Sequence, residues 1–245
     1  MTKRWGDLSQ RPVRMSEKGE KMKLPFKVDL TDKVAAITGA GGVICSEFAR
    51  VLAECGAKVA LLDTNKERAS EYAAEIGKNA TAIKCDCLDK KEIEEAKKII
   101  GEKWGKVNLL INGAEGNNPK ATCDDETMTP GLENAKDFFA LEESGLKFVF
   151  DINVVSAFLV TQVFAMDMIK IGGNIINISS MNAYRPLTKI PAYSAAKAGI
   201  SNFTQWLAVH FAPCNIRCNA IAPGFFVTNQ NKELLYNKDG TPTAR

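Results

Sequence analysis

The stretch that decides the fold is Val34-Ala-Ala-Ile-Thr-Gly-Ala-Gly-Gly-Val-Ile-Cys45, an apolar run followed by a glycine-rich turn. The run is typical of a buried strand, and helical periodicity begins directly after the turn. Glycines at such a turn let backbone N–H groups approach a pyrophosphate at the N-terminus of the helix, where the helix dipole favours an anion. We therefore expect five residues here to bind a dinucleotide: Gly39, Gly41, Gly42, Val43 and Ile44.

The same alternation of short apolar runs and longer helical segments continues along the chain. Further strands are predicted at 58–62, 81–84, 107–111, 174–178 and 216–221, and helices at 46–55, 66–76, 90–104, 148–170 and 192–211. A β-α order requires crossovers of a dozen or more residues that cover the sheet. The predicted fold class is therefore α/β, a Rossmann-type doubly wound parallel sheet in three layers, α/β/α.

The chain divides into a basic N-terminal extension, 1–30, and a single dinucleotide-binding and catalytic domain, 31–245. A polar insertion at about 116–145 is too long for an ordinary β-to-α connection, and loops of that length are often functional. The segment 229–245 is polar and predicts no further strand, so we expect the last strand of the sheet to be missing from this sequence.

Composition and charge exclude several classes of partner. The formal net charge of the 245 residues is +3, and residues 1–28 hold eight Lys and Arg against three Asp and Glu, which leaves −2 for the rest. A domain body without net positive charge does not predict a nucleic-acid partner. The sequence contains no signal-peptide segment near Met1 and no uncharged apolar run of the roughly 18 residues that a membrane span needs.

The cysteines and the histidine predict neither disulfides nor a metal site. Seven cysteines in a chain of this size indicate a reducing compartment, and the cytoplasm is the simplest one. A zinc site would need scattered thiols, because the sequence has one histidine and no C-x-x-C pair. We expect His210 to be a packed helix residue.

An acidic residue closes the second predicted strand. In Leu61-Leu62-Asp63 the carboxylate comes roughly 25 residues after the first glycine of the turn, where Rossmann domains place a carboxylate on the adenosine ribose hydroxyls. A carboxylate there would repel a 2′-phosphate. Asp63 therefore favours NAD over NADP, and the alternative is that Asp63 only caps the next helix.

A second group of residues predicts proton-transfer chemistry. In Tyr193-Ser-Ala-Ala-Lys197, positions i and i+4 share one face of a helix, so the Lys197 ammonium can lower the pKa of Tyr193 from about 10 towards working pH. Such a tyrosine can exchange a proton with an alcohol or a carbonyl. Ser180 follows the strand predicted at 174–178, and its hydroxyl can bind the same substrate oxygen.

With these residues in place, the chain resembles the short-chain dehydrogenase/reductase family over about 33–230. The family's motifs occur in order: Thr38-Gly39, Asp86, Asn112-Gly-Ala114, Asn153, Ser180, Tyr193 with Lys197, and Pro223-Gly224 followed by Thr228.

The resemblance implies a role for each of four catalytic residues. Tyr193 is the expected general acid and base, and Lys197 is expected to hold the nicotinamide ribose and to bias Tyr193. Ser180 is expected to orient the substrate oxygen, and Asn153 to help hold a water relay to Lys197.

The resemblance also implies cofactor contacts outside the first turn. Asp86 and the Cys87 backbone are expected at the adenine, and Pro223, Gly224 and Thr228 around the nicotinamide amide. The remaining expected cofactor-binding residues are Asn112, Gly113 and Ala114, together with Tyr193 and Lys197.

More narrowly, residues 117–120, 173–191 and 222–230 are similar to the short-chain type of D-mannonate oxidoreductase, also called fructuronate reductase. That family interconverts D-mannonate and D-fructuronate with a nicotinamide cofactor. The substrate carries a carboxylate, with which Arg185 or Lys189 could pair. The expected substrate contacts are Ser180, Arg185 and Tyr193, and the family implies a homo-oligomer, a dimer or tetramer.

Three residues depart from the family pattern. Val43 and Cys45 stand at the second and third glycine positions of the first turn. Because β-branched Val43 resists positive φ, we expect Gly41 and Gly42 to absorb the strain. Glu115 stands where the Asn112 turn has its final glycine, and a carboxylate near the cofactor would need a partner or a water.

Two classes of function stay open from the sequence. The first is an NAD-dependent oxidoreductase for a sugar acid, with a related polyol or gluconate dehydrogenase such as gluconate 5-dehydrogenase as the alternative. The second is a non-catalytic dinucleotide-binding paralogue, which the three departures and the expected absence of the last strand suggest. The four expected catalytic residues argue against it, because a chain without a catalytic role has no physical reason to combine them.

Overall fold

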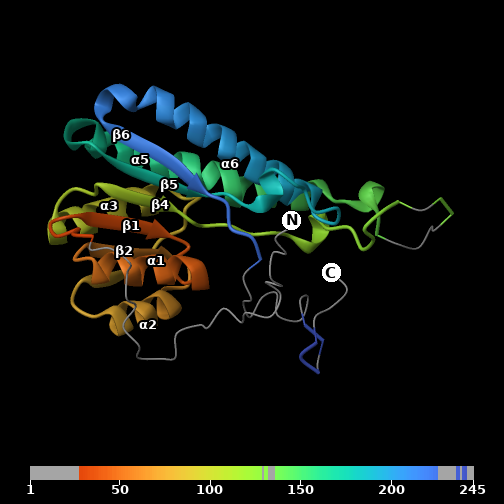
Figure 1. Cartoon of the computed structure of the whole chain (residues 1–245), viewed down its shortest axis with the longest axis horizontal. Helices are drawn as coiled ribbons and strands as arrows, with labels where there is room; N and C mark the ends of the chain where they lie inside the picture. The colour runs from red at the N-terminus through yellow and green to blue at the C-terminus, as the bar shows by residue number, and fades with distance from the viewer. Residues whose placement is uncertain (1–27, 129, 132–135, 226–235, 238, 242–245) are drawn as a thin grey trace, which may run out of the picture.

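Figure 1 shows the computed structural model of the chain, which describes residues 28–128, 130–131, 136–225, 236–237 and 239–241. Most of the predicted N-terminal extension, and Thr228, lie outside these residues. The strands are β1 (Val34–Thr38), β2 (Lys58–Asp63), β3 (Ala80–Lys84), β4 (Leu109–Asn112), β5 (Gly173–Ile178) and β6 (Ile216–Ile221). The α-helices are α1 (Val43–Glu54), α2 (Lys66–Ile76), α3 (Lys90–Trp104), α4 (Glu143–Phe150), α5 (Ser156–Ile171) and α6 (Pro191–His210).

The six strands form one parallel sheet in the order β3-β2-β1-β4-β5-β6. After β3 the chain returns past β1 to build the other half of the sheet, so the strand order reverses between β1 and β4. Ligands of doubly wound sheets bind at the carboxyl ends of the strands at such a switch point. The structure confirms the predicted Rossmann-type fold class, and β3 and β6 are the two edge strands of the described sheet.

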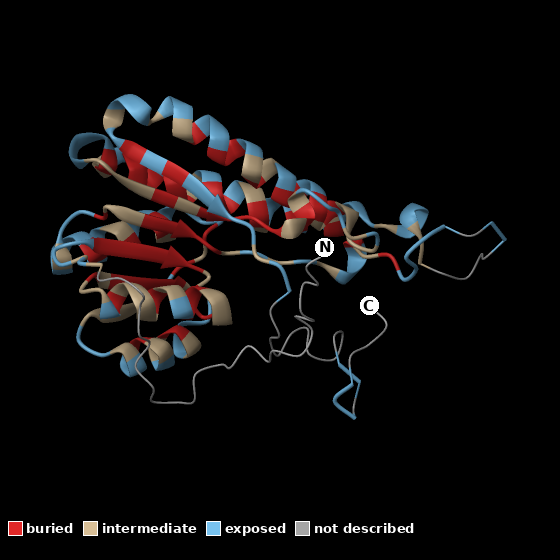
Figure 2. Ribbon diagram, viewed as in Figure 1, coloured by how far each residue is buried: buried red, intermediate tan, exposed pale blue. Residues whose placement is uncertain are grey.

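Helices cover both faces of the sheet, which explains why the strands read as continuous apolar runs. All five residues of β1 are buried. One core cluster lies between the sheet and α1 and α2, and a larger one lies between the sheet and α3, α5 and α6. Figure 1 shows α1 and α2 on one side of the sheet and α5 and α6 on the other, and Figure 2 shows the buried strands between these layers.

Two helices begin and end where the sequence predicts because polar caps and glycines bound them. The side chain of Asn65 accepts a hydrogen bond from Arg68 N at the start of α2, and Asp89 accepts from Lys91 N at the start of α3. The helices end at Gly77 and Gly105, both with φ near 90°. Glycine adopts positive φ at low cost, so it stops a helix cleanly.

The helix predicted at 148–170 begins earlier, at Glu143, and consists of α4 and α5 joined by a π-helical segment, Asp151–Val155. By length and composition the run Glu143–Ile171 could cross a membrane. Half of its most apolar window is buried within the protein, and α5 buries Phe164 and Met168 in the core. This burial is typical of the core helix of a folded domain.

The insertion at 116–145 lies beside the start of α6 (Figure 1). Its described part contains two short 3₁₀ turns, Pro119–Ala121 and Phe138–Ala140. The backbone N–H of Cys123 donates to the carbonyl of Lys189 at 2.7 Å, which ties the insertion to the loop before α6. The insertion is thereby held at the end of the sheet where the strands' carboxyl ends lie.

Candidate active site

The turn after β1 folds back onto the turn after β4. Gly39 has φ +65°, and a Cβ at this position would lie 2.6 Å from the carbonyl oxygen of Gly113. Gly42, by contrast, has an ordinary φ of −84°. The expectation that Gly41 and Gly42 absorb the strain of the turn is therefore wrong, because Gly39 alone of the three adopts the left-handed conformation.

Gly41 is needed for close approach to Asp63. A Cβ on Gly41 would lie 2.9 Å from Asp63 Cγ, and the Gly41 N–H donates to Asp63 Oδ2 at 2.8 Å. Asp63 Oδ1 accepts from the N–H of Asn65, the residue that caps α2 with its own side chain. The alternative that Asp63 is the helix cap is wrong, and its carboxylate instead supports the glycine turn.

These two turns and the end of β2 border a cleft of about 290 Å³. The residues lining it are Gly39, Gly41, Gly42, Val43, Ile44, Cys45, Asp63, Asn65, Arg68, Gly113 and Glu115. The cleft thus joins the open N-terminus of α1, which suits a pyrophosphate, to a carboxylate that suits ribose hydroxyls. The residues present fit a dinucleotide with an unphosphorylated adenosine ribose.

Other expected cofactor residues lie just after the carboxyl ends of strands and do not line the cleft. Asp86 and Cys87 follow β3 at the same edge of the sheet, and Asp86 Oδ1 accepts from Leu88 N. Pro223 follows β6, and its carbonyl accepts from Met181 N at 3.0 Å, which places the Pro223-Gly224 turn beside the residue after Ser180.

The turn after β4 is fixed by buried polar contacts. The Asn112 side chain donates to Thr161 and to Asn177, so it ties β4 and β5 to α5. The Thr38 hydroxyl accepts from the N–H groups of Gly113 and Ala114 at 3.0 and 3.2 Å. The Asn112 side chain therefore stabilises the turn from its buried side, and the backbone that follows Asn112 borders the cleft.

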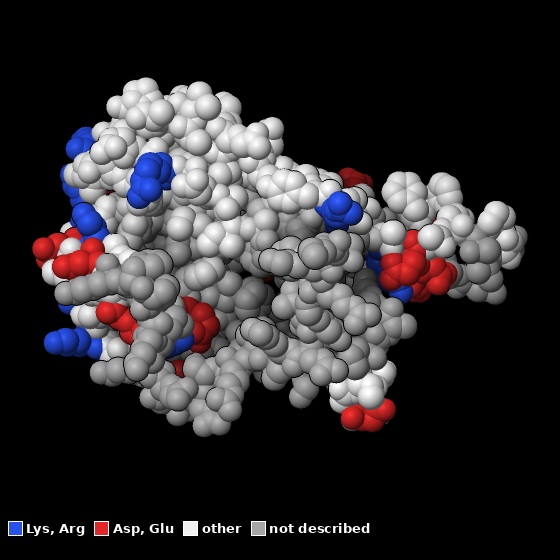
Figure 3. Space-filling model, viewed as in Figure 1, with Lys and Arg blue, Asp and Glu red and all other residues white. Residues whose placement is uncertain are grey.

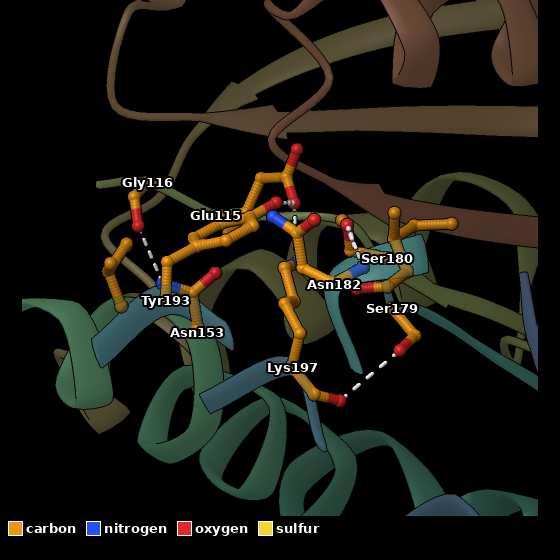
Figure 4. Close-up of polar contacts among 12 residues, drawn as sticks. Glu115, Gly116, Asn153, Ser179, Ser180, Asn182, Tyr193 and Lys197 are labelled. Carbon is orange, nitrogen blue, oxygen red and sulfur yellow. Dashed lines mark hydrogen bonds and ion pairs between the residues drawn. The ribbon is translucent and has the colours of Figure 1, made fainter. Parts of the chain in front are cut away.

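Ser180, Tyr193 and Lys197 converge at the carboxyl edge of the sheet (Figure 4). Ser180 lies two residues after the end of β5, is buried, and accepts a hydrogen bond from Asn182 N. Tyr193 and Lys197 are one turn apart on α6, and Lys197 Nζ lies 5.4 Å from the centre of the Tyr193 ring. Three of the four predicted catalytic residues are thus brought together.

Glu115 is the site residue whose role sequence reasoning missed. Its Oε2 atom lies 2.5 Å from Lys197 Nζ and accepts a hydrogen bond from the Tyr193 hydroxyl at 3.1 Å (Figure 4). Lys197 and Tyr193 are therefore the partners that a carboxylate at this position requires. The departure from the family glycine was visible in the sequence, but the partners of the carboxylate were not.

The electrostatics of Tyr193 differ from the expectation. Burial, the Glu115 charge and the hydrogen bond to Glu115 all raise the pKa of Tyr193, against a smaller lowering contribution from the Ser180 hydroxyl. The pKa of Tyr193 is therefore raised and not lowered as expected, because burial and the Glu115 carboxylate outweigh the Lys197 ammonium beside the phenol.

Asn153, the fourth predicted catalytic residue, lies in the π-helical segment between α4 and α5. Its side-chain amide donates to the carbonyls of Gly116 at 2.7 Å and Val149 at 2.8 Å. π-Helical segments often occur at functional sites, where they redirect one residue. Asn153 thereby anchors the residue next to Glu115, and its buried Oδ1 has no partner among the described residues.

The two cations considered for the substrate carboxylate differ in their surroundings. Arg185 is exposed, just beyond the short 3₁₀ turn that follows Ser180. Lys189 Nζ lies 3.9 Å from Glu126 of the insertion, so an acidic neighbour already compensates part of its charge.

Within the described ranges, no group of three or more His, Cys, Asp or Glu side chains could hold a metal ion. His210 ends α6, where it is exposed and stacks on Trp206 with ring centres 4.3 Å apart. Its ring also makes an edge contact with Phe211, with ring centres 5.2 Å apart, so the expected packing of His210 is limited to these ring contacts on an exposed side chain.

The fold and the site define a class: dinucleotide-dependent oxidoreductases on a Rossmann-type sheet. The model of the short chain dehydrogenase family matches residues 33–239. The chain belongs to the short-chain dehydrogenase family, whose members are oxidoreductases that use a nicotinamide dinucleotide.

Two relatives are similar over most of their length. An oxidoreductase of Haemophilus influenzae, otherwise uncharacterized, is 54% identical over 229 residues, which are 91% of this chain and 80% of the relative. An uncharacterized oxidoreductase of Bacillus subtilis named UxuB is 50% identical over 226 residues, 91% of this chain and 81% of the relative.

A solved structure is similar in fold and sequence. It is a crystal structure from Haemophilus influenzae, provisionally described as a D-mannonate oxidoreductase, with bound NAD. The TM-score is 0.85 at 54% identity, over 89% of this chain and 79% of that one.

Proposed function

We propose that this protein interconverts D-mannonate and D-fructuronate, with NAD as its cofactor. The observation that carries the proposal is the convergence of Ser180, Tyr193 and Lys197 beside a cleft suited to a dinucleotide. The relative from Haemophilus influenzae that is described as a D-mannonate oxidoreductase supports the choice of substrate.

In the proposed reaction, side chains at the carboxyl edge of the sheet transfer the proton. The cofactor, when bound, supplies or accepts the hydride at the substrate carbon. The Ser180 hydroxyl orients the substrate oxygen, and Tyr193 takes the proton from the alcohol or gives it to the carbonyl. Lys197 holds the nicotinamide ribose and keeps a positive charge beside the phenol, while Asn153 supports the water relay behind it.

The cofactor lies along the cleft in this proposal. The N-terminus of α1 would hold its pyrophosphate, and the Asp63 carboxylate would bind the adenosine ribose. Asp63 already accepts two backbone N–H groups, so its charge is fixed in place. A fixed carboxylate repels a 2′-phosphate, and we therefore propose NAD rather than NADP. The other proposed contacts are Asp86, Cys87, Asn112, Gly113, Ala114, Pro223, Gly224 and Thr228.

We assign the substrate carboxylate to Arg185. Arg185 is exposed near Ser180, whereas Glu126 already compensates part of the charge of Lys189. Arginine can bind a carboxylate through two parallel hydrogen bonds. Replacing Arg185 by Ala should raise the KM for the sugar acid while kcat changes less, and an unchanged KM would contradict the assignment.

The decisive experiment follows NADH oxidation at 340 nm with D-fructuronate in the parent protein and in Tyr193→Phe. We expect the variant to lose at least about 100-fold in kcat, because it keeps the ring and removes the exchangeable proton. The matched control is Tyr72→Phe at saturating NADH, since the Tyr72 hydroxyl makes only a long 3.5 Å contact with Arg68. Equal turnover by the parent and by Tyr193→Phe would refute the acid–base role.

A substrate panel separates the alternatives. Turnover of 5-ketogluconate in preference to D-fructuronate would favour a gluconate 5-dehydrogenase. NADH binding without oxidation across the panel would favour a non-catalytic paralogue.

We also propose that the protein is a homo-oligomer that pairs through the outer faces of α5 and α6. Exposed apolar side chains lie on these helices: Phe158, Met166, Ile169, Trp206 and Val209. The only Lys, Arg, Asp or Glu in the 20 residues of α6 is the buried Lys197, and Figure 3 shows few charges over this part of the surface. Contiguous exposed apolar surface of this kind marks protein–protein contacts.

Light scattering after size exclusion tests this arrangement. We expect a dimer or tetramer for the parent and a smaller species for Trp206→Glu. The same species for both chains would contradict an interface at this face. As control, Lys98→Glu reverses a charge in an exposed ion pair on α3.

The cellular location proposed is the cytoplasm. All seven cysteines are free in the structure, and several are buried. Free thiols in such number suit a reducing compartment.

A further inference from the structure

Glu115 occupies the centre of the proposed catalytic group, yet the proposed reaction gives it no task. One of its oxygens, Oε2, lies 2.5 Å from Lys197 Nζ and 3.1 Å from the Tyr193 hydroxyl. Figure 4 shows the carboxylate between the phenol and the ammonium. A single atom thereby engages both groups on which proton transfer depends.

Lys197 is enclosed by protein, and its ammonium has few contacts other than the one with Glu115. Its side chain is only 2% exposed, and Nζ also donates to the carbonyl of Ile178 at 2.8 Å. Glu115 supplies the negative charge that such a buried cation needs. The proposed function gives the same ammonium a second task, which is to hold the hydroxyls of the nicotinamide ribose.

The backbone on both sides of Glu115 is fixed. On one side, the Thr38 hydroxyl accepts hydrogen bonds from the N–H groups of Gly113 and Ala114. On the other side, the Asn153 amide donates to the carbonyl of Gly116. The Glu115 side chain itself is 34% exposed and lines the cofactor cleft. The carboxylate can therefore leave Lys197 by rotation of its own side chain, without movement of the turn.

We propose that Glu115 is a latch on the catalytic lysine: its carboxylate holds the Lys197 ammonium until the cofactor displaces it, and this competition sets the cofactor affinity. The inference rests on the proposed function, specifically on ribose binding by Lys197. Glu115 is in this sense a positioning residue that weakens binding of the nicotinamide cofactor.

The charges around the cleft support the competition. Asp63 already places one carboxylate in the cleft, and Arg68 is the cation that lines it. Glu115 adds a second negative charge to the lining of the same cleft, and its carboxylate repels the negatively charged dinucleotide. The raised pKa of Tyr193 has the same origin in part, because the Glu115 carboxylate opposes a second negative charge on the phenol.

The test measures the Kd for NADH by fluorescence, without any sugar acid, in the parent and in Glu115→Gln. The amide is isosteric and its oxygen can still accept from Lys197 and Tyr193, so the packing is kept while the charge is removed. We expect the Kd for NADH to fall about 3- to 5-fold, the upper end of what an ion pair open to solvent gives when its free energy is converted to affinity.

Two further variants separate the effect of the Glu115 charge from the effect of side-chain length and from the effect of the protein's net charge. Glu115→Asp keeps the charge but shortens the reach, so its Kd should lie between those of the parent and of Glu115→Gln. Glu95→Gln removes a carboxylate from an exposed ion pair with Lys98 on α3 and should leave the Kd unchanged.

An unchanged or higher Kd for Glu115→Gln, with parent binding intact, would overturn the latch and leave the proposed function standing. A Kd that falls equally in Glu95→Gln would also overturn it, since net charge alone would then explain the effect. Absence of NADH binding in every chain would overturn the latch and the proposed function together. If Glu115→Gln does not fold, the Kd of Glu115→Asp is compared with that of the parent. An unchanged or higher Kd for Glu115→Asp would then overturn the latch.

Discussion

The two turns that border the cofactor cleft both depart from the pattern of their family, but with opposite consequences. In the turn after β1, Val43 and Cys45 replace glycines, and the chain absorbs them: Val43 begins α1, and Cys45 is buried against the turn after β4. In that second turn Glu115 replaces a glycine and reaches the Tyr193–Lys197 pair. Neutral substitutions of moderate size change packing, whereas a charge changes the chemistry of its neighbours.

The two turns differ because the packing effect of a neutral side chain and the effect of a charge extend over different distances. The Cys45 thiol contacts the carbonyl of Gly113 at 3.9 Å, and burial together with the Glu115 charge raises its pKa to about 12, so it stays neutral. A neutral side chain acts only on the atoms it touches. The carboxylate of Glu115 acts on every ionisable group in the cleft that solvent does not screen.

The largest effect is expected where the two turns meet. Gly113→Ala would place a Cβ 2.2 Å from Cys45 Sγ and 2.9 Å from the carbonyl of Thr38. Overpacking of this kind should lower the free energy of unfolding by about 1–3 kcal/mol. Gly101→Ala is the control, because no atom lies within 4 Å of the added Cβ in α3, and it should stabilise slightly. Urea denaturation of both variants measures the contrast, and equal stabilities would show that the turns are not packed together.

The next effect concerns the carboxylate behind the first turn. Asp63→Asn keeps an oxygen acceptor for the Gly41 N–H but removes the charge that repels a 2′-phosphate. The ratio of NADPH to NADH affinity should rise about 10-fold. Asp89→Asn, a change at the cap of α3, is the control and should leave the ratio unchanged. A ratio unaffected by Asp63→Asn would remove Asp63 from the adenosine site.

A smaller effect, on the pKa of Tyr193, tests the turn after β4. The pKa of Tyr193 is raised, so the parent should show no Tyr193 phenolate absorbance up to about pH 11, when Tyr193→Phe is the reference. Glu115→Gln removes a negative charge beside the phenol, which favours the phenolate and lowers the pKa. Its phenolate signal should therefore emerge at lower pH than in the parent. A signal in the parent near pH 10 would show that Glu115 does not act on Tyr193.

Sequence periodicity was sufficient for the fold because both faces of the sheet are covered. Every predicted strand occurs within one or two residues, and α2 and α3 have the predicted bounds because caps and glycines mark them. The segment 148–170 was predicted less well. Its helix begins at Glu143 and includes a π-helical segment, which depends on side-chain contacts such as those of Asn153 rather than on periodicity.

The candidate site was predictable as a set of residues but not as an electrostatic arrangement. The spacing of Tyr193 and Lys197 on one helix fixes their proximity, and the structure keeps it. The raised pKa of Tyr193 comes first from burial and then from Glu115, which is 78 residues away in sequence and reaches the site only through the order of the strands. Long-range contacts of this kind leave no periodic signal.

The smallest effect tests whether the first turn truly tolerates its substitutions. Cys45→Gly restores the family glycine, removes a neutral thiol and leaves the Gly113 turn without its 3.9 Å contact. Glycine within α1 should cost about 1 kcal/mol in the free energy of unfolding, while the Kd for NADH should change less than about 3-fold. Thermal unfolding and NADH fluorescence on the same sample separate the two quantities. A change in Kd as large as that of Glu115→Gln would show that packing beneath the turn, and not charge, limits cofactor affinity.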